Sequence, residues 1–126
     1  MPTYFPITPA EMDAYREAAR QRHIAEKAHL RERRQRAWGL ARQAARLLEE
    51  HFNAKRVVLF GSLAHEDRFN PWSDVDIAAW GLRPEDTWRA LGAVMDLDSD
   101  IEVNLVDIVC CRPALRAVIE REGIDL

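Results

Sequence analysis

The pattern of residues along the sequence changes near residue 55, and this change limits the folds that the chain can adopt. Between Pro9 and Phe52 only Gly39 interrupts a run of residues that are compatible with one helix. After residue 55, short β-rich runs alternate with helical patterns. Such alternation is typical of an α/β sheet that carries helices. We therefore expect one long N-terminal helix followed by a small α/β domain.

The first part of the long helix is polar. Thr8 can cap it, Pro9 suits the first helical position and Glu11 completes a capping box. Between residues 9 and 36, apolar side chains are sparse among arginines and glutamates. A helix of that length extends about 40 Å at ~1.5 Å per residue, and it is too polar to be a core element. We expect residues 1–36 to project, or to lie against a partner or a second copy of the chain.

The second part of the same helix carries an apolar stripe at helical spacing, so it should pack on the domain. The members of this stripe are Ala37, Leu40, Ala41, Ala44, Leu47, Leu48 and Phe52. Residues 37–126 are accordingly expected to form one folded domain.

The remaining elements are predicted from short apolar runs and their breakers. Three strands are expected, at residues 56–60, 75–80 and 101–109. Two helices are expected, at residues 84–97 and 113–122, with Gly123 as the C-terminal cap of the second.

Composition excludes several classes of protein. With 48% hydrophobic and 31% charged residues, the 126-residue chain is expected to be soluble and globular. No apolar run approaches the ~20 residues of a membrane span, and the N-terminus lacks the pattern of a signal peptide. The two cysteines, Cys110 and Cys111, are adjacent and predict no disulfide framework. A cytoplasmic protein without a membrane partner is therefore expected.

The net charge of −3 conceals an asymmetry between the two parts of the chain. Residues 1–56 contain 12 Lys and Arg against 7 Asp and Glu, whereas residues 57–126 contain 6 against 14. The basic part could attract nucleic acid or an acidic protein surface, or it could be a solvated helix of mixed charge. It lacks the interleaved aromatic residues of a nucleic-acid surface, so no direct nucleic-acid binding is expected.

Two carboxylates stand at the head of the second predicted strand. Because side chains alternate along a strand, Asp74 and Asp76 point the same way, while Val75 and Ile77 point into the opposite layer. Two like charges side by side repel each other and add nothing to stability. A divalent cation removes this conflict, and carboxylate oxygens suit Mg²⁺. The alternative is simple turn chemistry after Asn70.

A Gly-Ser pair follows the first predicted strand. Gly61 lets the backbone come close to a ligand, and Ser62 can offer its hydroxyl and its N–H to a phosphate. If residues 62–68 begin a short helix, its first N–H groups add to an anion site.

The combination resembles the minimal nucleotidyltransferase (MNT) family within the DNA polymerase β-like superfamily. The resemblance covers roughly residues 37–126 and rests on the segments 60–62, 72–77, 101–107 and 115–123. It implies a small mixed sheet flanked by helices, here preceded by the long N-terminal helix. Members transfer a nucleoside monophosphate, usually AMP from ATP, to an acceptor. Many are antitoxins of HEPN-domain ribonuclease toxins, and some adenylylate a tyrosine on the toxin.

By this resemblance, Ser62 in the Gly61-Ser62 loop would hold the triphosphate, and Asp74 and Asp76 would hold Mg²⁺. The chain departs from the family at the third acid, whose position is occupied by Asn104. Asparagine carries no charge and cannot take a proton from an attacking hydroxyl. Glu102 faces the same way and is a candidate substitute, although it lies nearly 7 Å along the strand.

The phosphate loop departs as well. Where family loops read Gly-Ser-x-Ala-Arg-Gly, this chain has His65 and Glu66 at the last two positions. Arg68 could restore a positive charge near the nucleotide.

Two functions are therefore weighed. The first is an antitoxin that binds a HEPN toxin and transfers AMP from Mg–ATP to it, with Asp74, Asp76 and Asn104 or Glu102 at the catalytic centre. The second is a degenerate binding module that neutralises its partner by stoichiometric contact. Transfer to a small molecule such as an aminoglycoside is a third reading, but the chain is short for the extra acceptor domain.

Overall fold

The computed structural model describes residues 6–126, so the first five residues of the expected N-terminal extension lie outside the described residues. Helix α1 runs from Pro9 to Phe52. The other main elements are β1 (Arg56–Phe60), β2 (Val75–Trp80), α2 (Thr87–Met95), β3 (Val103–Asp107), α3 (Pro113–Glu122) and β4 (Ile124–Asp125). Short 3-10 helices cover η1 (Ser62–Ala64), η2 (Pro84–Asp86) and η3 (Ile108–Cys110). Within residues 6–126, no helix is long and apolar enough to cross a membrane.

The N-terminal end of α1 is closed by the expected capping box. The Glu11 backbone N–H donates to Thr8 Oγ1 at 3.1 Å, and the Thr8 N–H donates to Glu11 Oε2 at 3.1 Å. These two bonds satisfy donors that a helix start otherwise leaves without partners. The chain divides into two compact units, one ending at Glu32 and the other spanning Arg33–Leu126, and α1 contributes to both. The projection of residues 1–36 stays a prediction.

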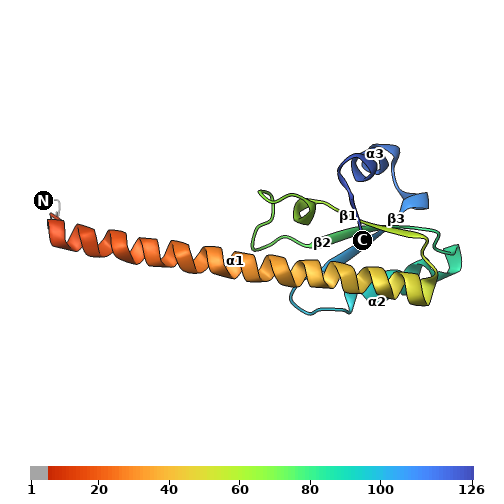
Figure 1. Cartoon of the computed structure of the whole chain (residues 1–126), viewed down its shortest axis with the longest axis horizontal. Coiled ribbons are helices and arrows are strands. Elements are labelled where there is room, and N and C mark those ends of the chain that lie inside the picture. Colours follow the sequence, from red (N-terminus) through yellow and green to blue (C-terminus); the bar gives the residue numbers. More distant parts are fainter. Residues whose placement is uncertain (1–5) are drawn as a thin grey trace, which may run out of the picture. The chain divides into compact units, whose positions relative to one another are not determined.

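In the second unit, the four strands form one mixed sheet in the order β3-β2-β1-β4 (Figure 1). Strands β2 and β3 are parallel, whereas β1 pairs antiparallel with both β2 and β4. This arrangement confirms the expected mixed sheet flanked by helices.

Helices cover both faces of the sheet. Helix α3 lies on one face, and α2 lies with the C-terminal part of α1 on the other (Figure 1). The core on the α3 side joins Val58, Phe60, Ala78, Ile108 and Ile119. On the other side, the predicted stripe of α1 is buried apart from the half-buried Leu47. Burial of this stripe explains why the sequence keeps it apolar.

Strands β1 and β2 and helix α3 have the predicted bounds. The third strand is shorter than predicted, because the Asp107 side chain accepts from the Val109 N–H at 3.2 Å and begins a 3-10 turn. The helix expected at residues 84–97 begins with the 3-10 turn η2, and its α-helical part ends at Met95.

Gly123 caps α3 as predicted, but not by a left-handed backbone, since its φ is −70°. Glycine is needed there for space: an added Cβ would lie 2.2 Å from Val58 Cγ1 on β1.

Candidate functional site

The candidate site lies where β1 ends and where β2 and β3 begin. The pairing register sets Asp76 on β2 between Phe60 on β1 and Asn104 on β3. Asn104 Nδ2 donates a hydrogen bond to Asp76 Oδ1 at 3.3 Å. Val75 and Ile77, on either side of Asp76, are fully buried on the opposite face. The alternation inferred from the sequence is therefore present at Asp76, while Asp74 lies one residue before the strand.

Several groups near Asp76 change the pKa of its carboxyl. Burial raises the pKa of the Asp76 carboxyl above its ordinary value, and the hydrogen bond from Asn104 partly lowers it again. The nearby charges of Asp74 and Glu102 raise the same pKa further. The structure thus brings together four of the predicted residues, with an amide at the third position and an unfavourable concentration of negative charge.

The backbone of Gly61 lies directly beside the Asp76 carboxylate. Gly61 has a φ of +77° and a ψ of −158°, a conformation that other residues rarely adopt. A Cβ added to Gly61 would lie 2.5 Å from Asp76 Oδ2. The sequence interpretation reserved this glycine for a ligand, and the structure adds the close contact with Asp76.

Ser62 follows directly and begins the 3-10 helix η1, which ends at Ala64. Three residues form no helix of the length considered for residues 62–68, so the loop offers Ser62 and single backbone groups to an anion. Arg68 is exposed, and within residues 6–126 its side chain makes no hydrogen bond or ion pair that directs it to the site. His65 lies 3.4 Å from Glu122 Oε2 on α3 instead.

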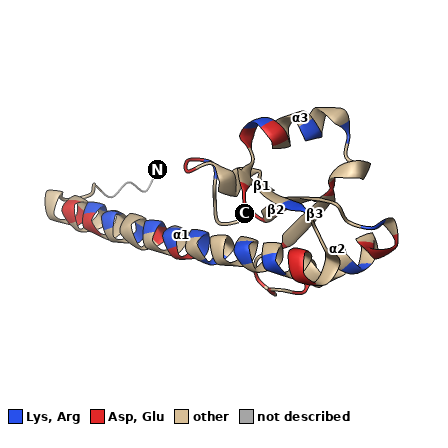
Figure 2. Cartoon of the chain, turned by 45° about the vertical axis from the view of Figure 1, so that its right-hand side comes forward, with Lys and Arg blue, Asp and Glu red and all other residues tan. Residues whose placement is uncertain are grey.

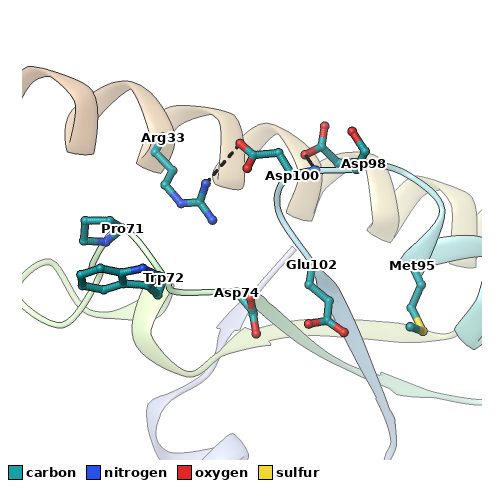
Figure 3. A pocket seen from close by; sticks show the side chains of 9 residues that line it. Arg33, Pro71, Trp72, Asp74, Met95, Asp98, Asp100 and Glu102 are labelled. Carbon is teal, nitrogen blue, oxygen red and sulfur yellow. Dashed lines mark hydrogen bonds and ion pairs between the residues drawn. The ribbon is translucent and has the colours of Figure 1, made fainter.

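A pocket of about 570 Å³ opens beside these carboxylates (Figure 3). Asp74 and Glu102 lie on one side of it, and Arg33 reaches toward it from α1 (Figure 3). Trp72 and Met95 contribute the large apolar side chains of the lining. Trp72 is 84% exposed. Sequence spacing could not indicate this pocket, because its walls come from three distant segments.

Asp107, at the end of β3, takes no part in the site. Thr87 Oγ1 on α2 donates to Asp107 Oδ2 at 3.0 Å, so this buried carboxylate links α2 to the end of β3.

The donor set fits one hard cation. Asp74 and Asp76 offer carboxylate oxygens, and Mg²⁺ commonly binds through one or two carboxylates while keeping positions for water and phosphate oxygens. In the part of the chain that the structure describes, no group of three or more His, Cys, Asp or Glu side chains has the geometry of a metal site. The donors present therefore suit a cation that arrives together with a phosphate ligand.

Comparisons with known proteins agree with the sheet topology. No sequence model of a known family matches the chain, and no curated protein matches it. A chain in the structure of a toxin–antitoxin complex with AMP-PNP is 26% identical, with 68% of this chain and 70% of that chain covered and a TM-score of 0.54. A chain of the MntA–HepT toxin–antitoxin complex is 21% identical, with 68% of both chains covered and a TM-score of 0.51.

A third structure, of a protein described as a minimal nucleotidyltransferase, is 30% identical. The match covers 79% of this chain and 94% of that chain, with a TM-score of 0.49.

Proposed function

We propose that this chain, a member of the minimal nucleotidyltransferase family, is an antitoxin. It is similar to antitoxins of toxin–antitoxin pairs. The proposed reaction is the transfer of AMP from Mg–ATP to a tyrosine of a HEPN-domain ribonuclease toxin. One observation supports this most: two carboxylates stand at the head of β2, with the Gly61 backbone held against one of them. The AMP-PNP in one similar complex supports a nucleotide as the substrate.

In this proposal, Asp74 and Asp76 hold Mg²⁺, and Ser62 donates to a phosphate oxygen through its hydroxyl and its backbone N–H. Bound Mg²⁺ would neutralise charge on the phosphates. Gly61 leaves room for the Asp76 carboxylate, because a Cβ at this position would lie 2.5 Å from Asp76 Oδ2. Arg68 is kept as a candidate contact of the nucleotide, because a loop arginine can turn toward a phosphate.

The tyrosine hydroxyl attacks the α-phosphorus, the bond from that phosphorus to the bridging oxygen breaks, and pyrophosphate leaves. A phenol has a pKa near 10 and releases its proton far more readily than an alcohol, so the demand on a general base is small. Glu102 is the candidate acceptor of that proton, because it lines the same pocket as Asp74. Asn104 holds Asp76 in place by its hydrogen bond.

Mass spectrometry of the protein encoded beside this chain tests the proposal, after incubation with ATP and Mg²⁺. The expected result is a gain of one or more AMP units on a tyrosine of that protein. Asp76→Asn should lose at least ~100-fold in rate, since metal and phosphate positioning supply most of the catalysis. Asn104→Asp restores a third acid and should raise the rate about 10-fold or more. Absence of AMP with both the native chain and Asn104→Asp contradicts transfer to that protein.

The second candidate is neutralisation by contact alone, and the identity of Asn104 favours it. An amide at the third position donates to Asp76 instead of sharing a metal with it. In this case Asp76→Asn should still protect cells from the toxin, whereas transfer requires that this variant fails to protect. Growth of cells that express the toxin with either variant separates the two functions.

The N-terminal part of α1 is the candidate docking element for the toxin. A chain that starts at Arg33 retains the ion pairs of Arg33 and Arg36 with the loop at Asp98 and Asp100. It should keep the thermal transition of the second unit and lose binding of the toxin by at least ~10-fold. Tight binding by the shortened chain would exclude residues 1–32 as the docking element.

A further inference from the structure

The pocket beside Asp74 is bordered by an exposed indole, that of Trp72. Trp72 is 84% exposed, although an indole ordinarily gains free energy by burial. Its backbone is held by a tight turn, in which the Trp72 N–H donates to Asn70 Oδ1 at 2.8 Å and the Asn70 N–H donates to Ser73 Oγ at 3.0 Å. Ser73 is itself buried. The turn therefore holds the backbone of Trp72 at the edge of the pocket, which the indole lines (Figure 3).

The pocket carries an excess of negative charge. Four carboxylates line it, and two of them are paired within the molecule. Arg33 Nη1 and Arg36 Nη1 each lie 3.2 Å from Asp100 Oδ2, and Arg36 Nη2 lies 3.4 Å from Asp98 Oδ2. Within residues 6–126, neither Asp74 nor Glu102 has a hydrogen-bond or ion-pair partner through its side chain.

This charge separates the two sides of the site. A triphosphate would be repelled by the unpaired carboxylate of Glu102, so it belongs on the side of Gly61 and Ser62. The pocket with Trp72 is left for the other substrate. Its chemistry suits a cation that can also stack on an indole.

We propose that this pocket binds the guanidinium group of an arginine on the partner's acceptor segment, stacked on Trp72 and attracted by the carboxylates that line the pocket. The inference rests on the proposed transfer to a protein partner, and it specifies what selects that partner. The arginine side chain would bring the neighbouring tyrosine hydroxyl to Asp74 and Asp76.

The same chain already uses guanidinium–indole contacts. The Arg56 guanidinium lies 4.5 Å from the ring centroid of Trp80, and that of Arg42 lies 5.4 Å from the ring centroid of Trp38. No such contact is recorded for Trp72 in the described part of the chain. A planar guanidinium can meet a carboxylate through two N–H groups while its face rests on an aromatic ring, whereas the lysine ammonium is a compact charge.

Binding of two synthetic peptides to the full chain tests the inference without the partner and without nucleotide. The probes are acetyl-Gly-Arg-Gly-Tyr-Gly-amide and the same peptide with citrulline, a neutral isostere, in place of arginine. Titration is followed by NMR of the indole N–H signals. We expect the arginine peptide to bind at least ~10-fold tighter, with an affinity that falls as salt increases.

Two variants and a matched control locate the contact. Trp72→Ala should weaken arginine-peptide binding about 3-fold and Glu102→Gln about 10-fold. Trp88→Ala is the control, because Trp88 is 83% exposed and lines a different pocket with Leu82 and Leu91. It should leave the affinity within about 2-fold of the native chain.

Equal binding of the two peptides, or equal losses in Trp72→Ala and Trp88→Ala, would overturn the inference. Transfer assays keep the two proposals apart. If AMP transfer to the partner occurs, Trp72→Ala should raise the KM for the partner and leave the KM for ATP unchanged. If the peptide binds as expected but no AMP is transferred, the proposed function fails while the pocket assignment stands.

Discussion

Asp76 and Gly61 are the two residues whose contact shapes the candidate site. The backbone of Gly61 lies so close that an added Cβ would be 2.5 Å from Asp76 Oδ2. Its φ of +77° adds a conformational reason for glycine. Residue 61 must therefore be glycine both for its backbone conformation and for the space that the Asp76 carboxylate occupies.

Gly61→Ala should lower the free energy of unfolding by roughly 1–3 kcal/mol, because the backbone conformation is strained for alanine and the methyl group meets Asp76. Gly39→Ala is a matched control inside α1, where no atom lies within 4 Å of the added Cβ. It should raise the free energy of unfolding by roughly 0.5–1 kcal/mol. Urea denaturation measures both. A Gly61→Ala variant as stable as the native chain would show that the backbone relaxes freely there.

The charge of Asp76 predicts a pH dependence of stability. Burial raises the pKa of this carboxyl above its unfolded value of 3.8, so the folded chain holds the proton more tightly than the unfolded chain. The associated stabilisation is present below pH 3.8 and is lost as the pH rises through the folded pKa. Asp76→Asn should therefore match the native chain in acid and exceed its free energy of unfolding at neutral pH.

The excess should be a few tenths to about 1 kcal/mol, because solvent screens a carboxylate that is only partly buried. Urea denaturation across the pH range, without divalent cations, provides the measurement. If the free energies of unfolding of Asp76→Asn and the native chain differ by the same amount at every pH, titration of Asp76 does not contribute to the pH dependence of stability.

The sequence predicts which polar residues gather at the site, but it does not predict the pocket beside them. Strand alternation pairs Asp74 with Asp76 and Glu102 with Asn104, and the structure brings the two pairs together around Asp76. The pocket beside them needs Arg33 and the loop at Asp98 to meet a turn at Trp72. Contacts between such distant segments depend on packing that no local pattern encodes.

Gly123, the C-cap of α3, lies in close contact with β1. A Cβ there would lie 2.2 Å from Val58 Cγ1 and 2.4 Å from the Ile119 carbonyl oxygen. Gly123→Ala should therefore lower the free energy of unfolding by roughly 1–3 kcal/mol through overpacking. Gly92→Ala, with no atom within 4 Å, is the control and should be neutral or stabilising. Thermal unfolding by circular dichroism compares the two, and equal midpoints would refute the close packing of α3 on β1.

The strands show which elements a sequence can specify alone. β1 and β2 are apolar runs between clear breakers, and their bounds were predicted correctly. β4 was not predicted, because it has only the two residues Ile124 and Asp125 and depends on pairing with Val58 and Leu59 on β1. β3 was predicted too long because its apolar run continues through Ile108 and Val109 after the backbone has turned.

In the whole molecule, basic and acidic side chains are distributed unevenly. Figure 2 shows Lys and Arg along α1 interspersed with acidic residues, while the loops of the sheet domain carry several Asp and Glu. Part of this asymmetry is used within the second unit, where Arg33 and Arg36 pair with Asp98 and Asp100. The remaining charge on Asp74, Asp76 and Glu102 is what a cation and a cationic substrate would neutralise.

Calorimetric titration of the native chain with AMP-PNP, with and without Mg²⁺, tests whether Asp74 and Asp76 form a nucleotide site. It needs no partner and reports the proposed metal and nucleotide site alone. The account predicts binding that weakens at least ~10-fold without Mg²⁺ or with Asp76→Asn. Glu85→Gln, a surface acid paired with Arg83, should bind like the native chain. Binding that is absent, or that is equal with and without Mg²⁺ and in Asp76→Asn, would contradict a nucleotide site built on Asp74 and Asp76.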